Sequence, residues 1–174
     1  MISQKKYEQE MVKRFGITQA TDFPHVNLSE DDEVPNGEIK ESEVKLAQSM
    51  AGALLWLTTR TRPDIAMTVS SACRLATKNP CKSVEISKAV MQYVLKVQGG
   101  LHYPQGVPKE TWGKRGQLHI ERHDRLLEVF ADIAYGTGSR HRSLQGLVVY
   151  FAGAPISWVS SQQPFVTYST AEAE

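Results

Sequence analysis

The chain has 174 residues, 41% of them hydrophobic, which suits one ordinary domain or two small ones with apolar cores. No apolar run approaches the roughly 20 residues that cross a bilayer, and the charged, amphipathic start is unlike a secretory signal, so we expect an intracellular chain. The net charge of +1 indicates no partner class, and two cysteines, Cys73 and Cys81, fit neither a disulfide framework nor a paired metal-ligand spacing.

The N-terminal part predicts a short helix and a long connection. Residues 2–15 carry apolar side chains at helical spacing, and Gly16 ends the pattern. Residues 18–41 lose the pattern among prolines, and seven acids accompany a single base between residues 30 and 43. We therefore expect residues 1–42 to form a short helix followed by an acidic, exposed linker.

Three amphipathic helices are predicted in residues 43–100. The first ends at the break before Pro63, which suits the first turn of the second helix because proline has no amide hydrogen to leave unpaired. The second stops near Asn79, and Ser83 is the predicted N-cap of the third, which ends at the glycine pair beginning at Gly99. With such short connections, the three should pack as a small antiparallel bundle.

A basic stretch accompanies these helices. Residues 60–82 contain five bases against a single acid, Asp64. Such a stretch could lie along a phosphate backbone, because clustered bases release counterions from nucleic acid, or it could be an ordinary solvated helix face. The candidate nucleic-acid contacts here are Arg60, Arg62, Arg74 and Lys78.

The period changes to that of strands after residue 100. Short connections between the strand-like runs predict an antiparallel meander, and residues 168–172 indicate a strand that gives way to a helix. The chain is thus expected to be α+β, with an interrupted sheet domain in residues 101–174. The predicted strands are 101–103, 118–120, 126–135, 144–151 and 155–160.

Acids in the predicted sheet domain are candidate metal ligands. Asp132 lies in an otherwise apolar strand, where a carboxylate needs a partner if it is buried. Ser169 and Glu172 match a capping box, which gives Glu172 a structural role. Glu174 lies roughly 200° further round the helix, so it is the better candidate to meet Asp132. Such carboxylates can hold the two magnesium ions of phosphodiester hydrolysis, although Asp132 could also be a solvent-facing edge residue.

Several motifs then resemble one family, in matching order. LLWLTTRTRPDIA at 54–66 resembles the helix junction of copia-type reverse transcriptases. APISW at 154–158 and YSTAEAE at 168–174 resemble their ribonuclease H segment, and ISQKKY at 2–7 is similar to the segment after their polymerase palm. The resemblance covers nearly the whole chain except the acidic loop and residues 104–125.

The resemblance implies a fragment of an LTR retrotransposon Pol polyprotein, from a mobile element that integrates its DNA. It implies RNA-directed DNA synthesis and hydrolysis of the RNA strand of RNA–DNA hybrids by four acids and two Mg²⁺ ions. Asp132 matches the first acid and Glu174 the second, while the other two would follow the chain's end and the polymerase aspartates would precede Met1. We therefore expect the isolated chain to be inactive.

Architecture and partners are implied in the same way. The helical region would be like a reverse transcriptase thumb or connection, and the sheet a truncated ribonuclease H-like one. The implied partners are an RNA–DNA hybrid or template–primer duplex and the remainder of the Pol polyprotein, and the implied location is a cytoplasmic particle or the nucleus.

Three further patterns give weaker indications of function. His119 and His123 stand four apart as in zinc proteases, but no glutamate directly follows His119. The glycines at 136–138 predict a hairpin turn rather than a phosphate loop, although Arg140 and Arg142 beside them could contact a hybrid backbone. Tryptophans could stack on bases but are expected in the core.

A second class of function is a non-catalytic interaction module. In that hypothesis the helices of residues 43–98 dock a partner protein and the sheet only caps them. Neighbouring polymerase motifs and further acids in the flanking sequence would favour the enzyme, whereas a host gene without them would favour the module.

Overall fold

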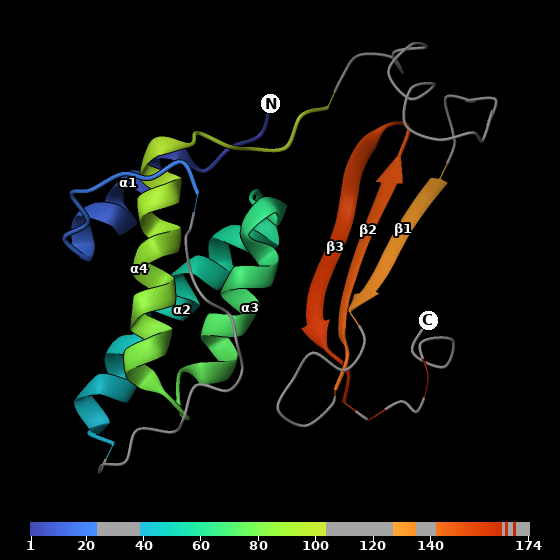
Figure 1. The fold of residues 1–174 in the computed structure, drawn as a ribbon. Coiled ribbons are helices and arrows are strands. Elements are labelled where there is room, and N and C mark those ends of the chain that lie inside the picture. The colour runs from blue at the N-terminus through green and yellow to red at the C-terminus, as the bar shows by residue number, and fades with distance from the viewer. Residues whose placement is uncertain (24–38, 104–126, 135–141, 165, 167–168, 170–174) are drawn as a thin grey trace.

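The computed structural model describes residues 1–23, 39–103, 127–134, 142–164, 166 and 169. Helices come first in the chain and strands follow, so the expected α+β architecture is confirmed (Figure 1). The helical elements are α1 (Lys5–Arg14), α2 (Glu41–Arg60), the single 3₁₀ turn η1 (Pro63–Ile65), α3 (Ala66–Leu75) and α4 (Pro80–Lys96). The strands are β1 (Leu127–Ala134), β2 (Leu144–Phe151) and β3 (Ala154–Gln162).

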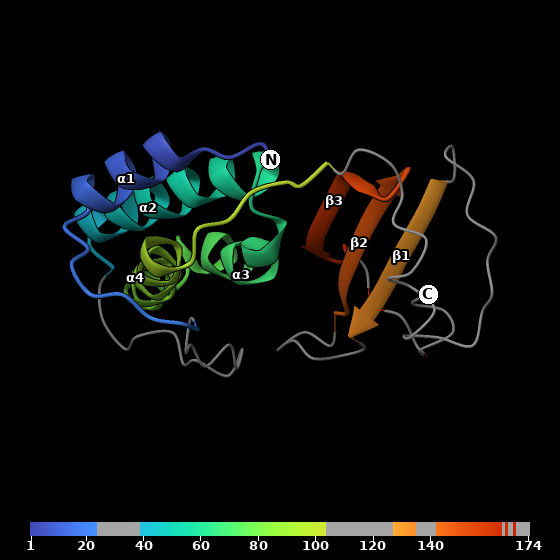
Figure 2. The ribbon, with the colours of Figure 1, turned by 90° about the horizontal axis from the view of Figure 1, so that it is seen from above.

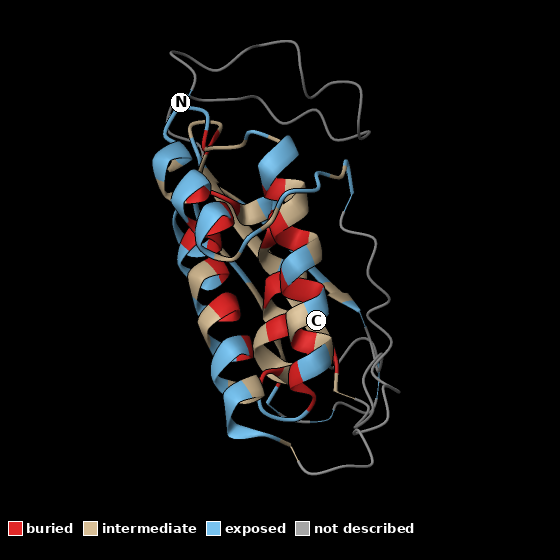
Figure 3. Ribbon diagram, turned by 90° about the vertical axis from the view of Figure 1, so that its left-hand side faces the viewer, coloured by how far each residue is buried: buried red, intermediate tan, exposed pale blue. Residues whose placement is uncertain are grey.

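The helices enclose one main apolar core and a smaller cluster of Ala51, Ala72 and Ile86. α2, α3 and α4 contact one another, and α1 lies against α4 (Figure 2). The apolar spacing that predicted each helix turns one stripe of each inward, and Figure 3 shows buried residues along these inner faces. Tyr7 adds a polar link between α1 and α2, since its hydroxyl donates to the Ala53 carbonyl at 2.9 Å. The core residues are Met11, Val12, Met50, Leu54, Leu57, Ile65, Val69, Val90, Met91 and Val94.

The start of α4 differs from the prediction at Ser83. Pro80 occupies the first turn, and the Asn79 side chain caps it by accepting from the Lys82 amide at 3.1 Å. Ser83 is instead fully buried, and its hydroxyl donates to the Ala72 carbonyl at 2.8 Å. The N-cap prediction is wrong because Asn79 and Pro80 already supply a cap and a first turn, which frees the serine to tie α4 to α3.

The sheet is the predicted antiparallel meander, with strand order β1-β2-β3. β2 turns into β3 through Ala152 and Gly153, whose φ angles of 50° and 78° are positive. In place of the expected strand at 101–103 there is a single bridge, in which Leu101 and Ile2 exchange two hydrogen bonds of 2.8 Å. Residues 24–38 of the predicted linker at 18–41 lie outside the described residues. So do the predicted strand at 118–120, the turn at 136–138 and the terminal helix.

The sheet meets the helices through β3. β3 is the strand nearest to the helical part in both views, and it contacts α3 (Figures 1 and 2). Among the described residues, hydrogen bonds link the two parts at two places. The Trp158 indole donates to the Thr58 carbonyl at 2.7 Å, and the Tyr103 hydroxyl donates to the Pro155 carbonyl at 3.1 Å. No helix in the described part of the chain is both long and apolar enough to cross a membrane.

Candidate nucleic-acid interface and metal site

Asp132 lies in the middle of β1, with an accessible carboxylate. Its register partners are Gly146 on β2 and, beyond it, Ser160 on β3, so its row across the sheet contains only small neighbours. Paired residues share one face of a sheet, and these two cannot cover the carboxylate. Asp132 is exposed, and its Oδ1 accepts a hydrogen bond from the Ile133 amide at 3.0 Å. The structure therefore shows a solvent-facing carboxylate on an outer strand of the sheet that the described residues form.

The expected partner of Asp132 is not among the described residues. Glu174 and the capping residue Glu172 lie outside the described residues, as do His119 and His123. Within the described ranges, no three acids, histidines or cysteines gather in a way that could hold a metal ion. Asp132 offers the oxygen ligand that magnesium prefers, but no second ligand stands beside it there. The pairing of Asp132 with Glu174 stays a prediction.

Arg60 and Trp56 form an exposed pair on α2. The Arg60 guanidinium lies over the Trp56 ring, 4.6 Å from its centroid, and Trp56 is 48% exposed. Gly52 lies one turn before Trp56 and is exposed, and a Cβ added there would meet nothing within 4 Å beyond the backbone of its own helix. Residues at this spacing follow one another along a helix face. We call Gly52, Trp56 and Arg60 the α2 face.

The expectation that tryptophans lie in the core is wrong for Trp56. The buried residues of α2 include Ala51, Leu54 and Leu57, and Trp56 lies off their stripe, as its helical spacing allows. An apolar run had suggested burial, whereas the periodicity within the run could have identified the exposed side. Trp158 is half-buried against Thr58, and Trp112 lies outside the described residues.

Arg62 does not contribute to a basic surface. Its side chain is fully buried, and it forms ion pairs with Glu8 at 3.1 Å and with Asp64 at 2.9 Å. It also donates to the Val97 carbonyl at 3.0 Å and lies over the Tyr93 ring at 5.5 Å. The prediction of a nucleic-acid contact at Arg62 is corrected, because a partner 54 residues away in sequence draws this arginine inward.

Electrostatics keep the buried arginine charged. Burial alone lowers the pKa of Arg62, but its hydrogen bonds and charge pairing with Asp64 and Glu8 outweigh that effect and hold the pKa above its ordinary value. Tyr93 donates to the Asp64 carboxylate at 3.2 Å. Burial and the Asp64 charge raise the pKa of the Tyr93 phenol, against the opposing influence of Arg62. We call Arg62, Glu8, Asp64 and Tyr93 the Arg62 cluster.

The remaining predicted contacts are scattered. Arg74 is half-buried, and its guanidinium donates to the Ser71 hydroxyl at 3.0 Å. Lys78 is exposed just after α3, and Arg142 is half-buried before β2. Arg140 lies outside the described residues. Of the predicted nucleic-acid contacts that lie in the described residues, Arg60 and Lys78 are the two that are exposed.

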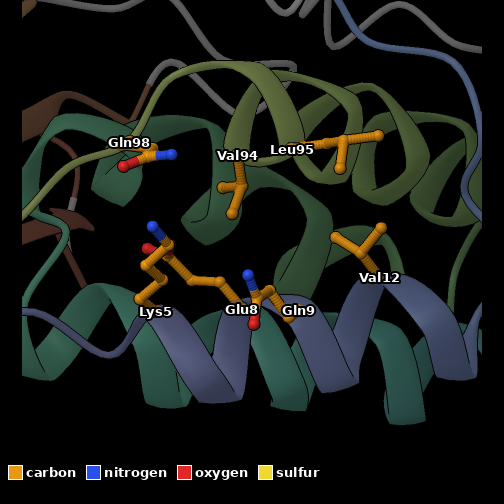
Figure 4. A pocket seen from close by; sticks show the side chains of 7 residues that line it. All are labelled: Lys5, Glu8, Gln9, Val12, Val94, Leu95 and Gln98. Atoms are coloured by element: carbon orange, nitrogen blue, oxygen red, sulfur yellow. The ribbon is translucent and has the colours of Figure 1, made fainter.

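A groove between α1 and α4 is the other hollow of note. Lys5, Glu8, Gln9 and Val12 line it from one side, and Val94, Leu95 and Gln98 from the other (Figure 4). Its volume of about 90 Å³ is well below the roughly 300–1,000 Å³ of ordinary ligand pockets. It has no room for a nucleotide.

Comparisons with known proteins identify relatives by sequence. No family model and no solved structure matches the chain. The retrovirus-related Pol polyprotein from transposon TNT 1-94 of Nicotiana tabacum is 30% identical over 182 residues, covering 99% of this chain and 12% of that protein. The uncharacterized mitochondrial protein AtMg00810 of Arabidopsis thaliana is 29% identical over 129 residues, covering 73% of this chain and 47% of that protein.

The chain thus spans less than half the length of either relative. The similarity to the tobacco protein nevertheless extends over 99% of this chain. The chain is accordingly a copia-type retrotransposon Pol sequence.

Proposed function

We propose that this chain is the part of a Pol polyprotein that joins the end of a reverse transcriptase to the start of a ribonuclease H domain. In the parent protein it would serve RNA-directed DNA synthesis and removal of the RNA strand from RNA–DNA hybrids. The proposal rests on the relationship to a Pol polyprotein and on two structural features, the α2 face and Asp132.

The single observation that carries the nucleic-acid role is the exposed Arg60–Trp56 pair. A guanidinium over an indole presents a fixed positive charge beside a flat aromatic surface, a combination that suits phosphates and bases or sugars. The missing side chain at Gly52 leaves open space beside the indole, so a bulky backbone can approach the helix closely. We propose that an RNA–DNA hybrid or template–primer duplex contacts this face.

For the nuclease half, we propose that Asp132 and Glu174 hold Mg²⁺ in the complete parent domain. The neighbours of Asp132 across the sheet, Gly146 and Ser160, are small. They support this proposal because they leave the carboxylate open to an ion and a phosphodiester. Bound metal would supply charge stabilisation and an activated water. With two of the family's four acids in the chain, we expect the isolated protein not to cleave a hybrid, and magnesium-dependent cleavage lost in Asp132→Asn would overturn that expectation.

Hybrid binding by the 174-residue chain tests the nucleic-acid role. We expect the double variant Trp56→Ala/Arg60→Ala to lose roughly tenfold or more in affinity, since one stacked aromatic is worth ~1–3 kcal/mol. Arg60→Ala alone should make the slope of log affinity against log salt shallower by about one. Lys88→Ala removes an exposed base from α4 and is the matched control.

Unchanged affinity and salt slope in the α2 variants would remove the proposed interface. If the wild-type chain fails to bind a hybrid even at low salt, the observation would favour a non-catalytic helical interaction module instead.

A further inference from the structure

The sheet is anchored at the C-terminal end of α2. Trp158, from the middle of β3, reaches across and donates its indole N–H to the Thr58 carbonyl at 2.7 Å. Trp158 is half-buried there, so the contact combines a short hydrogen bond with apolar burial. This contact joins residues 100 positions apart in the chain.

The Thr58 carbonyl is free because α2 ends irregularly. In a regular helix the Arg62 amide would donate to Thr58, four residues earlier. Here the Thr61 and Arg62 amides both donate to the Leu57 carbonyl, at 3.0 and 3.2 Å. The Thr58 oxygen is left without its helical partner, and a buried carbonyl needs another donor. The indole of Trp158 supplies it.

Side chains hold this irregular end in place. The Thr58 hydroxyl donates to the Arg62 carbonyl at 2.8 Å, which closes the loop back onto the helix. The Arg62 guanidinium is fixed in turn by Glu8, by Asp64 and by the chain that leaves α4 at Val97. Beside it, the Gly99 backbone packs so closely that a Cβ would come within 2.6 Å of the Arg62 Cζ. These contacts hold the irregular end of α2 in one conformation.

We propose that the irregular end of α2, residues 57–62, binds the Trp158 side chain and so sets the orientation of the sheet on the helical part. We call these residues the socket. The Arg62 cluster supports the socket from within the helical part, and Trp158 is the residue of the sheet that binds to it. The Tyr103–Pro155 hydrogen bond is a second link, and it contributes less because it is longer and solvent-exposed. The socket fixes where Asp132 stands relative to the α2 face, and it operates whether or not the chain binds nucleic acid.

Residual dipolar couplings of backbone amides test this in the whole chain. In the wild type, one alignment tensor should fit the amides of α2, α3, α4 and the three strands together. Trp158→Phe keeps an aromatic ring but has no N–H to donate, so the helices and the sheet should then need two different tensors. Trp56→Phe removes an indole from the exposed face of the same helix, and one tensor should still suffice.

One common tensor in Trp158→Phe would overturn the proposal, as would two tensors in the wild type. Should the strands of Trp158→Phe lose amide protection, Thr58→Val decides the question, because it leaves every sheet residue intact. That variant loses the bond to the Arg62 carbonyl and should loosen the socket, giving two tensors. A single tensor in Thr58→Val would then contradict the role of the socket.

Discussion

The helical part and the sheet are held in place by different kinds of contact. The helices enclose a core in which Leu54, Val69 and Val90 are completely buried. In the described strands, by contrast, Leu127, Val129 and Ile156 are more than half exposed, and Ala154 is the one apolar residue that is buried. The helices are therefore held by their own packing, whereas the position of the sheet depends on a few directed contacts.

The largest effect should come from the Arg62 cluster. Arg62→Ala leaves the Glu8 carboxylate buried without its cation, and truncating one partner of a buried ion pair costs ~3–5 kcal/mol. We expect a loss of that order in the free energy of unfolding, measured by chemical denaturation with helical circular dichroism. Arg60→Ala, two residues away and exposed, should change stability by less than about 0.5 kcal/mol. Equal losses of unfolding free energy in Arg62→Ala and Arg60→Ala would contradict the conclusion that buried contacts such as the Arg62 cluster hold the helical part together.

Two glycines provide a sharper comparison. Gly99→Ala places a Cβ against the Arg62 guanidinium and should cost ~1–3 kcal/mol, as overpacking does. Gly52→Ala adds a Cβ in open space within α2 and should stabilise the chain by ~0.5–1 kcal/mol. Thermal and denaturant unfolding of both variants measures the difference. If Gly99→Ala leaves the stability unchanged, then Gly99 is packed less tightly against Arg62 than the structure shows.

Tyr93 gives the same cluster a dependence on pH. Its folded pKa is raised above the ordinary value of 10.0, so its neutral form contributes stability that is complete below pH 10 and is lost as pH rises through the folded pKa. The free energy of unfolding of the wild type should therefore fall more steeply above pH 10 than that of Tyr93→Phe. Parallel curves for the two proteins would remove this contribution. Tyr7 also has a raised pKa but is common to both.

The smallest effect concerns thiol reactivity and tests how closed the helical core is. Burial raises the pKa of Cys73, and its side chain packs against the core, whereas Cys81 is exposed. At neutral to mildly alkaline pH, iodoacetamide should modify Cys81 much faster than Cys73, because the thiolate is the reacting species. Peptide mass spectrometry of partly labelled protein resolves the two rates. Similar rates would show that the helices open readily.

Periodicity made the helices and strands predictable. The 3.6-residue stripes located the four α-helices that the described residues contain, and short turns between β-rich runs indicated the meander. The cap at Ser83 was mistaken because Asn79 and Pro80 compete for the same role four residues earlier. Local sequence could not indicate the burial of Arg62, which depends on Glu8 in another helix.

The candidate site was predictable only in part. An acid in the middle of a mainly apolar strand identified Asp132 as unusual, and the strand register then showed how open its surroundings are. The α2 face was missed because a tryptophan inside an apolar run was assigned to the core without regard to its helical angle. Glu174 lies outside the described residues, so its pairing with Asp132 stays a prediction.

Paramagnetic relaxation by Mn²⁺ tests most directly whether Asp132 and Glu174 share a metal. Added in trace amounts to the 174-residue chain, Mn²⁺ should broaden the amide resonances around both residues together. Asp132→Asn and Glu174→Gln should each abolish the broadening at both places. Broadening that persists around Glu174 in Asp132→Asn, or that is absent around Asp132 in the wild type, would contradict a shared site.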